Sequence, residues 1–208
     1  MFACPLCRGP LVTGPNLESE LCACSAAYPY VDGVPVLVPQ PHAALHDLRR
    51  QVMRSWVVAA TAKVMGQRAI ALGGQAHDDV SAAIAGMTAN VELLEGLVAG
   101  ALETTTRIRQ PFRLAPVFEA NRRWSFESLL PYFVEDWASP RAPVRDLFIK
   151  DVQRHARRHC TALVIGSGAG PVASDMGCIF DQTLGVDASL PSVLLSKRIL
   201  AGESVDCH

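Results

Sequence analysis

The stretch Ala162-Leu163-Val164-Ile165-Gly166-Ser167-Gly168-Ala169-Gly170 decides the fold predicted for this chain. A short apolar run that gives way to three glycines at alternate positions is typical of a buried strand entering a tight turn. Pro171 suits the first position of a helix, where its missing N–H costs nothing. A second apolar run, residues 178–186, ends at Asp187. The order strand, glycine turn, helix, strand and acid is typical of a nucleotide-type cofactor site.

The residue types explain this prediction. Glycines let the backbone approach a ligand closely, and an acid at the tip of the second strand can accept hydrogen bonds from ribose hydroxyls. The spacing alone also admits a dinucleotide site. The predicted cofactor-binding residues are Gly166, Ser167, Gly168, Gly170 and Asp187.

Composition favours a folded protein with a packed core. Half of the 208 residues are hydrophobic and 19% are charged, which excludes wholesale disorder. The net charge of −1 does not indicate a nucleic-acid binder. No apolar run reaches the ~20 residues of a membrane span, and the first residues lack the features of a signal peptide. We therefore expect a cytoplasmic protein with reduced thiols and no membrane partner.

Four of the seven cysteines fall within the first 24 residues, in two close pairs. An odd total without a signal peptide argues against a disulfide framework, and the cluster argues for a metal. Zinc prefers four tetrahedral thiolates, and two short pairs bring them together at little entropic cost. Four thiolates leave no open coordination position, so the site is predicted to be structural. The predicted ligands are Cys4, Cys7, Cys22 and Cys24.

Residues 4–39 resemble a known family. Cys-Pro-x-Cys-x-Gly, a second cysteine pair, and Tyr-Pro-x-x-Asp-Gly-x-Pro-x-Leu are similar to the small zinc-ribbon family that includes the activator subunit of tRNA and protein methyltransferases. The same ribbon is also found fused to methyltransferases. The chain departs from the family in having Cys-x-Cys at 22 and 24, where many members have Cys-x-x-Cys.

Helical patterns occupy much of the middle of the chain. They predict helices over 42–66, 78–106, 143–159 and 190–201. Asp78 and Asp79 suit the start of the second helix, and its glycines at 86, 96 and 100 would permit close packing against a partner helix. We interpret this region as a helical layer facing the core, with a partner-binding or dimerising face as the alternative.

Residues 110–141 are rich in prolines and aromatics, with arginines in or just before the segment at 107, 109, 113, 122 and 123. Arginines interleaved with aromatics can stack on nucleic-acid bases, or they can cover an apolar surface while their charges stay wet. Because the net charge is not positive, RNA contact is the less favoured interpretation. The run Leu130–Trp137 resembles a stretch that precedes the cofactor domain in some ribbon-bearing methyltransferases.

The glycine stretch, together with Gly185-Val186-Asp187-Ala188-Ser189, resembles the first two motifs of class I S-adenosylmethionine-dependent methyltransferases. The resemblance implies that the glycine loop faces the methionine and ribose portions of S-adenosylmethionine and that Asp187 holds the ribose hydroxyls. Many family members carry an acid where this chain has Val164. After Gly170 the sequence holds about one βαβ unit of roughly 30 residues, whereas the family's later strands carry its remaining motifs.

These patterns predict an α/β protein with three parts. They are a zinc ribbon over 1–40, a helical and aromatic-rich segment over 42–141, and an incomplete Rossmann-like S-adenosylmethionine-binding domain over 142–208. The predicted function is that of an S-adenosylmethionine-dependent methyltransferase, as an N-terminal portion or a shortened form. The alternative is a non-catalytic interaction module whose sheet is completed by a protein partner or by a second copy. An incomplete gene product is a third interpretation.

Overall fold

A computed structural model describes residues 2–14, 19–71, 77–107, 128–138, 143–156 and 160–207. The chain forms two compact units, Met1–Phe126 and Glu127–His208, each of which is described by itself. The predicted boundaries were residues 40 to 42 and 141 to 142. In the structure the helices of residues 41–107 fall in the first unit and the helix of residues 129–138 in the second. The fold is mixed α/β.

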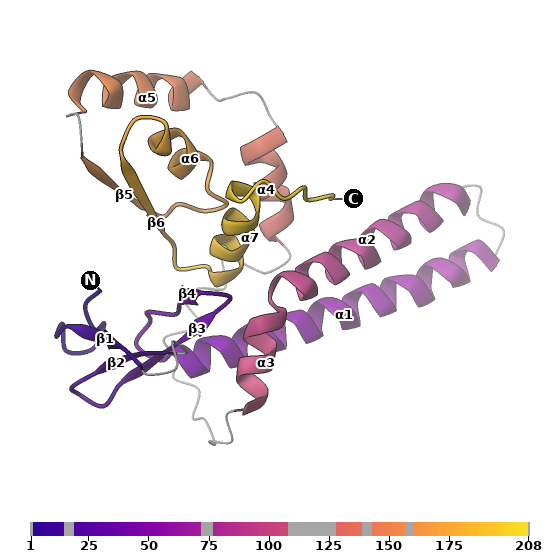
Figure 1. Ribbon diagram of the computed structural model, residues 1–208. Coiled ribbons are helices and arrows are strands. Elements are labelled where there is room, and N and C mark those ends of the chain that lie inside the picture. The colour runs from indigo at the N-terminus through magenta and orange to yellow at the C-terminus, as the bar shows by residue number, and fades with distance from the viewer. Residues whose placement is uncertain are drawn as a thin grey trace. The chain divides into compact units, whose positions relative to one another are not determined.

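The first unit begins with a curled antiparallel sheet in the order β1-β2-β3-β4 (Figure 1). The strands are β1 (Leu11–Thr13), β2 (Ser19–Cys22), β3 (Ala27–Val31) and β4 (Val34–Pro35). β1 pairs with β2 in the register Leu11↔Cys22, which returns the chain to the first cysteine pair. Asp32 and Gly33 join β3 to β4 with φ of 47° and 74°. Positive φ at both positions is typical of the two-residue hairpin turn that an Asp-Gly pair favours.

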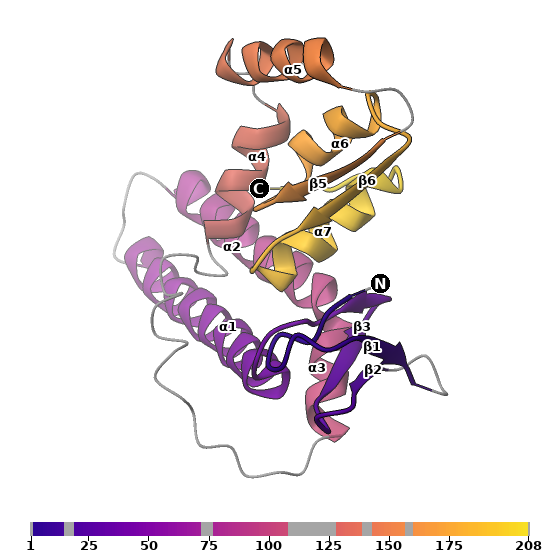
Figure 2. The same ribbon diagram turned by 90° about the vertical axis from the view of Figure 1, so that its left-hand side faces the viewer.

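Helices make up the rest of the described part of this unit, up to residue 107. They are α1 (Pro41–Ala71), α2 (His77–Leu97) and α3 (Ala99–Arg107). Figure 2 shows α1 and α2 side by side as a hairpin and α3 beside the sheet, in agreement with the contacts α1 makes with α2 and α3, and α3 with β3. Buried residues of this layer are Leu45, Leu48, Val52, Ala59, Val91, Leu94, Leu97, Val98 and Ala101.

The helix predictions need two corrections. The first helix continues five residues beyond the predicted end at Gly66, to Ala71. The second is interrupted at Val98, so that 78–106 is two helices. A β-carbon placed on Gly100 would lie 2.5 Å from Asp32 Oδ1, so this glycine admits the β3–β4 turn rather than a helix. The close helix contact is made by Gly66, where a β-carbon would collide with the Ile84 side chain.

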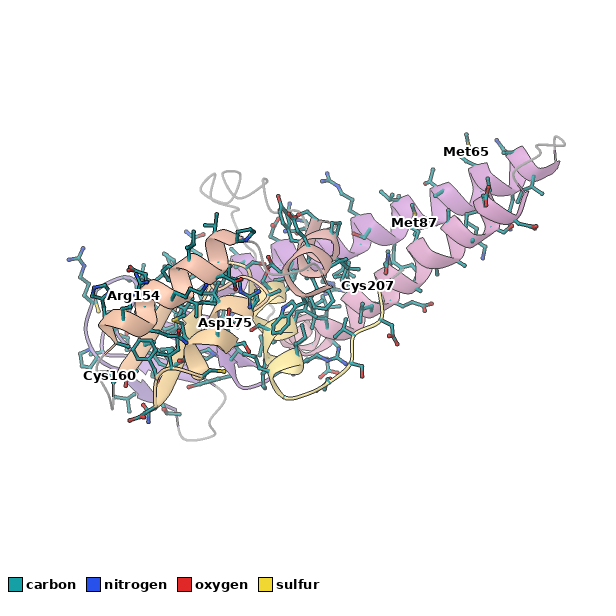
Figure 3. All side chains as sticks on the ribbon, turned by 90° about the horizontal axis from the view of Figure 1, so that it is seen from above. Met65, Met87, Arg154, Cys160, Asp175 and Cys207 are labelled. Carbon is teal, nitrogen blue, oxygen red and sulfur yellow. The ribbon has the colours of Figure 1, made fainter. Side chains whose placement is uncertain are left out.

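Along α2, the large apolar side chains are buried only from Val91 onward. Met87 is 39% exposed, and Met65 on the facing helix is 60% exposed. Both lie on the outer part of the hairpin (Figure 3). None of the described helices is long and apolar enough to cross a lipid bilayer.

The described part of the second unit, residues 128–138, 143–156 and 160–207, contains a pair of parallel strands with helices around it (Figure 1). Its elements are α4 (Leu129–Ala138), α5 (Pro143–His155), β5 (Thr161–Ile165), α6 (Pro171–Gly177), β6 (Gln182–Val186) and α7 (Leu190–Leu200). β5 pairs with β6 in the register Thr161↔Gln182 to Ile165↔Val186. α6 connects the two strands and packs on both.

Most of this order matches the prediction, with two differences. β6 begins at Gln182, because residues 178–181 form the turn that leaves α6, with Cys178 N donating to Asp175 O (3.1 Å). β5 is half-buried rather than buried, since Leu163 and Ile165 are 59% and 80% exposed on the face opposite α6.

Within the aromatic-rich segment, residues 129–138 are helical. Pro131 falls in the first turn of that helix, where proline is tolerated. The arginines and aromatics at 109–126, on which the RNA interpretation depends, lie outside the described residues, as does the predicted helix end at 157–159.

Candidate metal centre and glycine loop

Cys4, Cys7, Cys22 and Cys24 come together at one end of the N-terminal sheet. Their sulfur atoms all lie within 4.8 Å of one another. Cys4 Sγ is 3.7 Å from Cys24 Sγ, and Cys7 Sγ is 3.3 Å from Cys22 Sγ. A tetrahedral zinc site with Zn–S bonds of ~2.3 Å separates its sulfurs by about 3.8 Å. The four cysteines could therefore bind a metal ion, and the short Cys-x-Cys spacing does not exclude Cys22.

Two tight turns present these sulfurs. In the first, Cys4 N donates to Gly9 O and Arg8 N donates to Cys4 O, each at 2.8 Å. Gly9 N also points at Cys7 Sγ, 3.4 Å away. A β-carbon on Gly9 would lie 3.3 Å from that sulfur, which explains the glycine of the Cys-Pro-x-Cys-x-Gly pattern.

The second turn follows β2 and carries the other pair of sulfurs. Ser25 N donates to Cys22 O (2.9 Å), and Ser25 itself adopts a φ of 67°. Cys22 N donates to Ala26 O (2.9 Å), which returns the chain to β3. Main-chain hydrogen bonds therefore hold both cysteine pairs in place.

The environments of the sulfurs differ. Burial opposes ionisation of Cys4, but hydrogen bonds from the Tyr28 hydroxyl and from the backbone outweigh it and lower the pKa of Cys4 to about 6. The backbone of Cys24 favours the Cys22 thiolate, yet the neighbouring sulfurs and burial raise the pKa of Cys22 to about 12. Crowded sulfurs cannot all carry a negative charge without a cation between them. This donor set suits a metal ion that holds all four as thiolates.

The glycine loop lies at the carboxyl ends of the two parallel strands. Gly166, Gly168 and Gly170 have φ of 70°, 54° and 97°, values that favour glycine at each position. Gly166 N and Ser167 N both donate to Val186 O, at 2.8 and 3.1 Å, which ties the loop to β6.

The three glycines face different surroundings. Apart from the chain neighbours of Gly166, no described residue lies within 4 Å of a β-carbon placed on it, so this side of the loop is open. A β-carbon on Gly170 would instead collide with Ser196 Oγ of α7. Gly170 is therefore needed for packing inside the unit.

Asp187 lies beside this loop, as its position at the tip of β6 predicted. Its Oδ2 accepts a hydrogen bond from Gly168 N (2.9 Å), and its Oδ1 accepts one from Ser189 N (2.8 Å). Each carboxylate oxygen has a second lone pair, so Asp187 can still accept from a ligand hydroxyl. The structure thus brings Asp187 together with Gly166, Ser167 and Gly168.

Sequence reasoning missed two contributions of α4 to this region. Trp137 Nε1 donates to Ala169 O (3.0 Å) and so anchors α4 to the loop. The neighbouring Asp136 has its Oδ2 3.9 Å from a β-carbon placed on Gly168. Burial and the nearby Glu135 raise the pKa of Asp136, with Arg145 acting in the opposite direction. The available signal was the resemblance of the Leu130–Trp137 run to a stretch that precedes the cofactor domain in some ribbon-bearing methyltransferases.

Arg145 is the third residue that the sequence did not single out. Its guanidinium pairs with Asp175 Oδ2 at 2.6 Å and donates to Pro171 O at 3.0 Å. Asp175, labelled in Figure 3, is only 6% exposed on α6. This pair joins α5 to the helix that follows the glycine loop.

Comparisons with protein-family models, with curated proteins and with solved structures found no match for this chain. The functional argument therefore depends on the residues themselves.

Proposed function

We propose that this protein is an S-adenosylmethionine-dependent methyltransferase, in an N-terminal or shortened form, that carries a structural zinc site in an N-terminal zinc ribbon. The observation that carries the proposal is the contact of Asp187 with Gly168 N at the carboxyl end of a parallel strand pair. In open α/β sheets, ligands bind in the crevice outside this end. The methyltransferase motifs quoted above supply the choice of S-adenosylmethionine over a dinucleotide.

Each residue has a defined task in this proposal. Asp187 accepts hydrogen bonds from the ribose hydroxyls with the lone pairs that Gly168 N and Ser189 N leave free. The open side of Gly166 lets the ligand approach the main chain. S-adenosylmethionine supplies an activated methyl group, and the protein contributes by holding donor and acceptor in line. The methyl acceptor is unassigned.

The zinc proposal follows from the donor set. Four thiolates complete a tetrahedral shell, so the ion would stabilise the fold without taking part in chemistry. Cys4 is 1% exposed and belongs to the small core cluster with Leu11 and Tyr28. A metal at this position would therefore stabilise the part of the sheet that packs on this cluster.

Isothermal titration with S-adenosylmethionine and with its demethylated product tests the cofactor proposal. We expect both to bind the wild-type chain, and Asp187→Asn to weaken binding at least about tenfold through loss of a charged acceptor. Asp151→Asn is the matched control, because it makes the same change at an exposed position of α5. Absence of binding to folded wild-type protein would contradict the proposal, and so would equal binding by Asp187→Asn.

A second candidate function, from a different class, is that of an interaction module. Leu163, Ile165 and Leu184 are 59%, 80% and 45% exposed on one face of the β5–β6 pair. Parallel sheets are normally covered on both faces. A protein partner or a second copy of the chain that covers this face would complete the sheet.

Light scattering coupled to size exclusion tests the association of copies. Association through this face should weaken in Ile165→Thr, which removes apolar surface and keeps a β-branched side chain. Val12→Thr, at a 67% exposed position of the N-terminal sheet, is the control. A monomer at every concentration, with no partner recovered by the wild type, would count against this candidate.

A further inference from the structure

Tyr28 places a hydroxyl group against one sulfur of the candidate metal centre. Its side chain is 0% exposed, and its Oη lies 3.1 Å from Cys4 Sγ. Cys4 is 1% exposed, so bulk water does not reach that sulfur. The other sulfurs differ, since Cys7 and Cys24 are exposed and Cys22 is half-buried.

The direction of this hydrogen bond follows from the chemistry. A metal-bound thiolate has no proton and can only accept, whereas a tyrosine hydroxyl can donate. Hydrogen bonds to charged acceptors are stronger than those between neutral groups, and a buried site strengthens them further.

We propose that Tyr28 is a positioning residue of the metal centre, whose hydroxyl donates a hydrogen bond to the Cys4 thiolate. This inference rests on the metal site of the proposed function and adds the residue that orients one of its ligands. The bond fixes the orientation of the sulfur and withdraws electron density from it. Water can donate hydrogen bonds to the exposed sulfurs, but it cannot replace the Tyr28 hydroxyl at the buried Cys4 sulfur. Removing the hydroxyl therefore leaves Cys4 without this donor. Groups that orient metal ligands in this way commonly change metal affinity 10–100-fold when removed.

The same strand provides a matched control. Tyr30 also lies on β3, and its hydroxyl donates to Glu20 Oε1 at 2.6 Å. Tyr28→Phe and Tyr30→Phe therefore remove the same atom from the same strand, and each removes one hydroxyl donor. Only the first bond ends on a sulfur of the metal centre.

The test measures zinc affinity by competition with a chelator and the sulfur-to-metal charge-transfer band of the Co²⁺-loaded full chain. We expect Tyr28→Phe to weaken zinc binding about tenfold and to move the Co²⁺ band to longer wavelength, because a thiolate without its donor is more electron-rich. Tyr30→Phe should leave both quantities at their wild-type values. An unchanged band and affinity in Tyr28→Phe would overturn the inference, as would equal changes in both variants.

The same experiment separates this inference from the zinc proposal. If the wild type binds neither ion, the metal centre and the inference fall together. If the wild type binds both ions and Tyr28→Phe behaves like the wild type, only the inference falls.

Should Tyr28→Phe fail to fold, site-specific fluorotyrosines at position 28 keep the ring and strengthen the donor. A graded shift of the Co²⁺ band to shorter wavelength then supports the hydrogen bond, and a flat series overturns it.

Discussion

Gly170→Ala offers a sharp test of the packing of the glycine loop. Gly170 has a φ of 97°, which costs a residue with a side chain about 1–3 kcal/mol. Its β-carbon would also collide with Ser196 Oγ and lie 3.0 Å from Ser196 Cβ. Ser196 is buried on α7, so it has little room to move. Overpacking of this kind adds about 1–3 kcal/mol. The two effects together predict that Gly170→Ala lowers the free energy of unfolding by about 2–6 kcal/mol.

Two other glycines separate the contributions. Gly166 has a φ of 70°, and in the part of the chain that the structure describes only its chain neighbours come within 4 Å of a β-carbon placed on it. Gly166→Ala should therefore show the backbone cost alone, about 1–3 kcal/mol. Gly177 lies in α6 with open space around it and without a positive φ. Gly177→Ala should therefore be neutral or stabilising by up to about 1 kcal/mol.

Urea unfolding followed by circular dichroism gives the free energies of unfolding. Gly177→Ala should be the most stable of the three variants, Gly166→Ala should be intermediate, and Gly170→Ala should be the least stable. If Gly170→Ala were as stable as Gly166→Ala, this result would contradict the close packing of the loop against α7. If Gly166→Ala were as stable as Gly177→Ala, the left-handed conformation of the loop would be wrong.

Three further predictions concern buried polar groups and the metal. Thr183 Oγ1 is buried without a hydrogen-bond partner among the described residues, so Thr183→Val should raise the free energy of unfolding by about 1 kcal/mol. Thr161→Val, at an exposed position, should change the free energy of unfolding by less than about 0.5 kcal/mol. Burial raises the pKa of Asp136 in the folded state; its charged form therefore destabilises the fold at neutral pH, and this cost disappears as pH falls through the folded pKa. Asp136→Asn should thus exceed the wild type in thermal stability at pH 7 and lose that advantage near pH 3.5, and an advantage that persists there would contradict the assignment. Removal of the metal by a chelator should speed amide exchange in β1–β3 at least about tenfold while β5 and β6 stay protected. The reason is that the core of the N-terminal sheet includes a cysteine of the metal centre. Unchanged exchange in β1–β3 would exclude a structural metal.

Local signals made several elements predictable. The Asp32-Gly33 pair gave the hairpin turn, Pro171 gave the start of α6, and the cysteine spacing gave the four-sulfur cluster. Each of these depends on a few neighbouring residues whose chemistry permits one conformation. The meeting of Asp187 with the glycine loop was also predictable, because parallel strands end at the same edge of a sheet.

Features that depend on contacts between distant residues were not predictable. The local pattern carries no signal for the break at Val98 or for the approach of Asp32 to Gly100, and the anchoring of α4 depends on Trp137 reaching Ala169. The run at 161–165 also does not show whether one face of the strand or both faces will be covered. The exposure of Ile165 was therefore not predictable. Tyr28 appeared in the sequence only as part of a β-rich pattern, because nothing in its spacing shows that its hydroxyl would face Cys4.

The most direct test of the central claim is to record the amide NMR signals of the chain during titration with S-adenosylmethionine. We expect the largest shifts at Gly166, Ser167, Gly168 and the amides around Asp187, and we expect the amides of β1–β3 to keep their positions. Saturating ligand that leaves the loop amides unshifted, in protein whose spectrum shows it to be folded, would contradict the claim that this loop binds the cofactor.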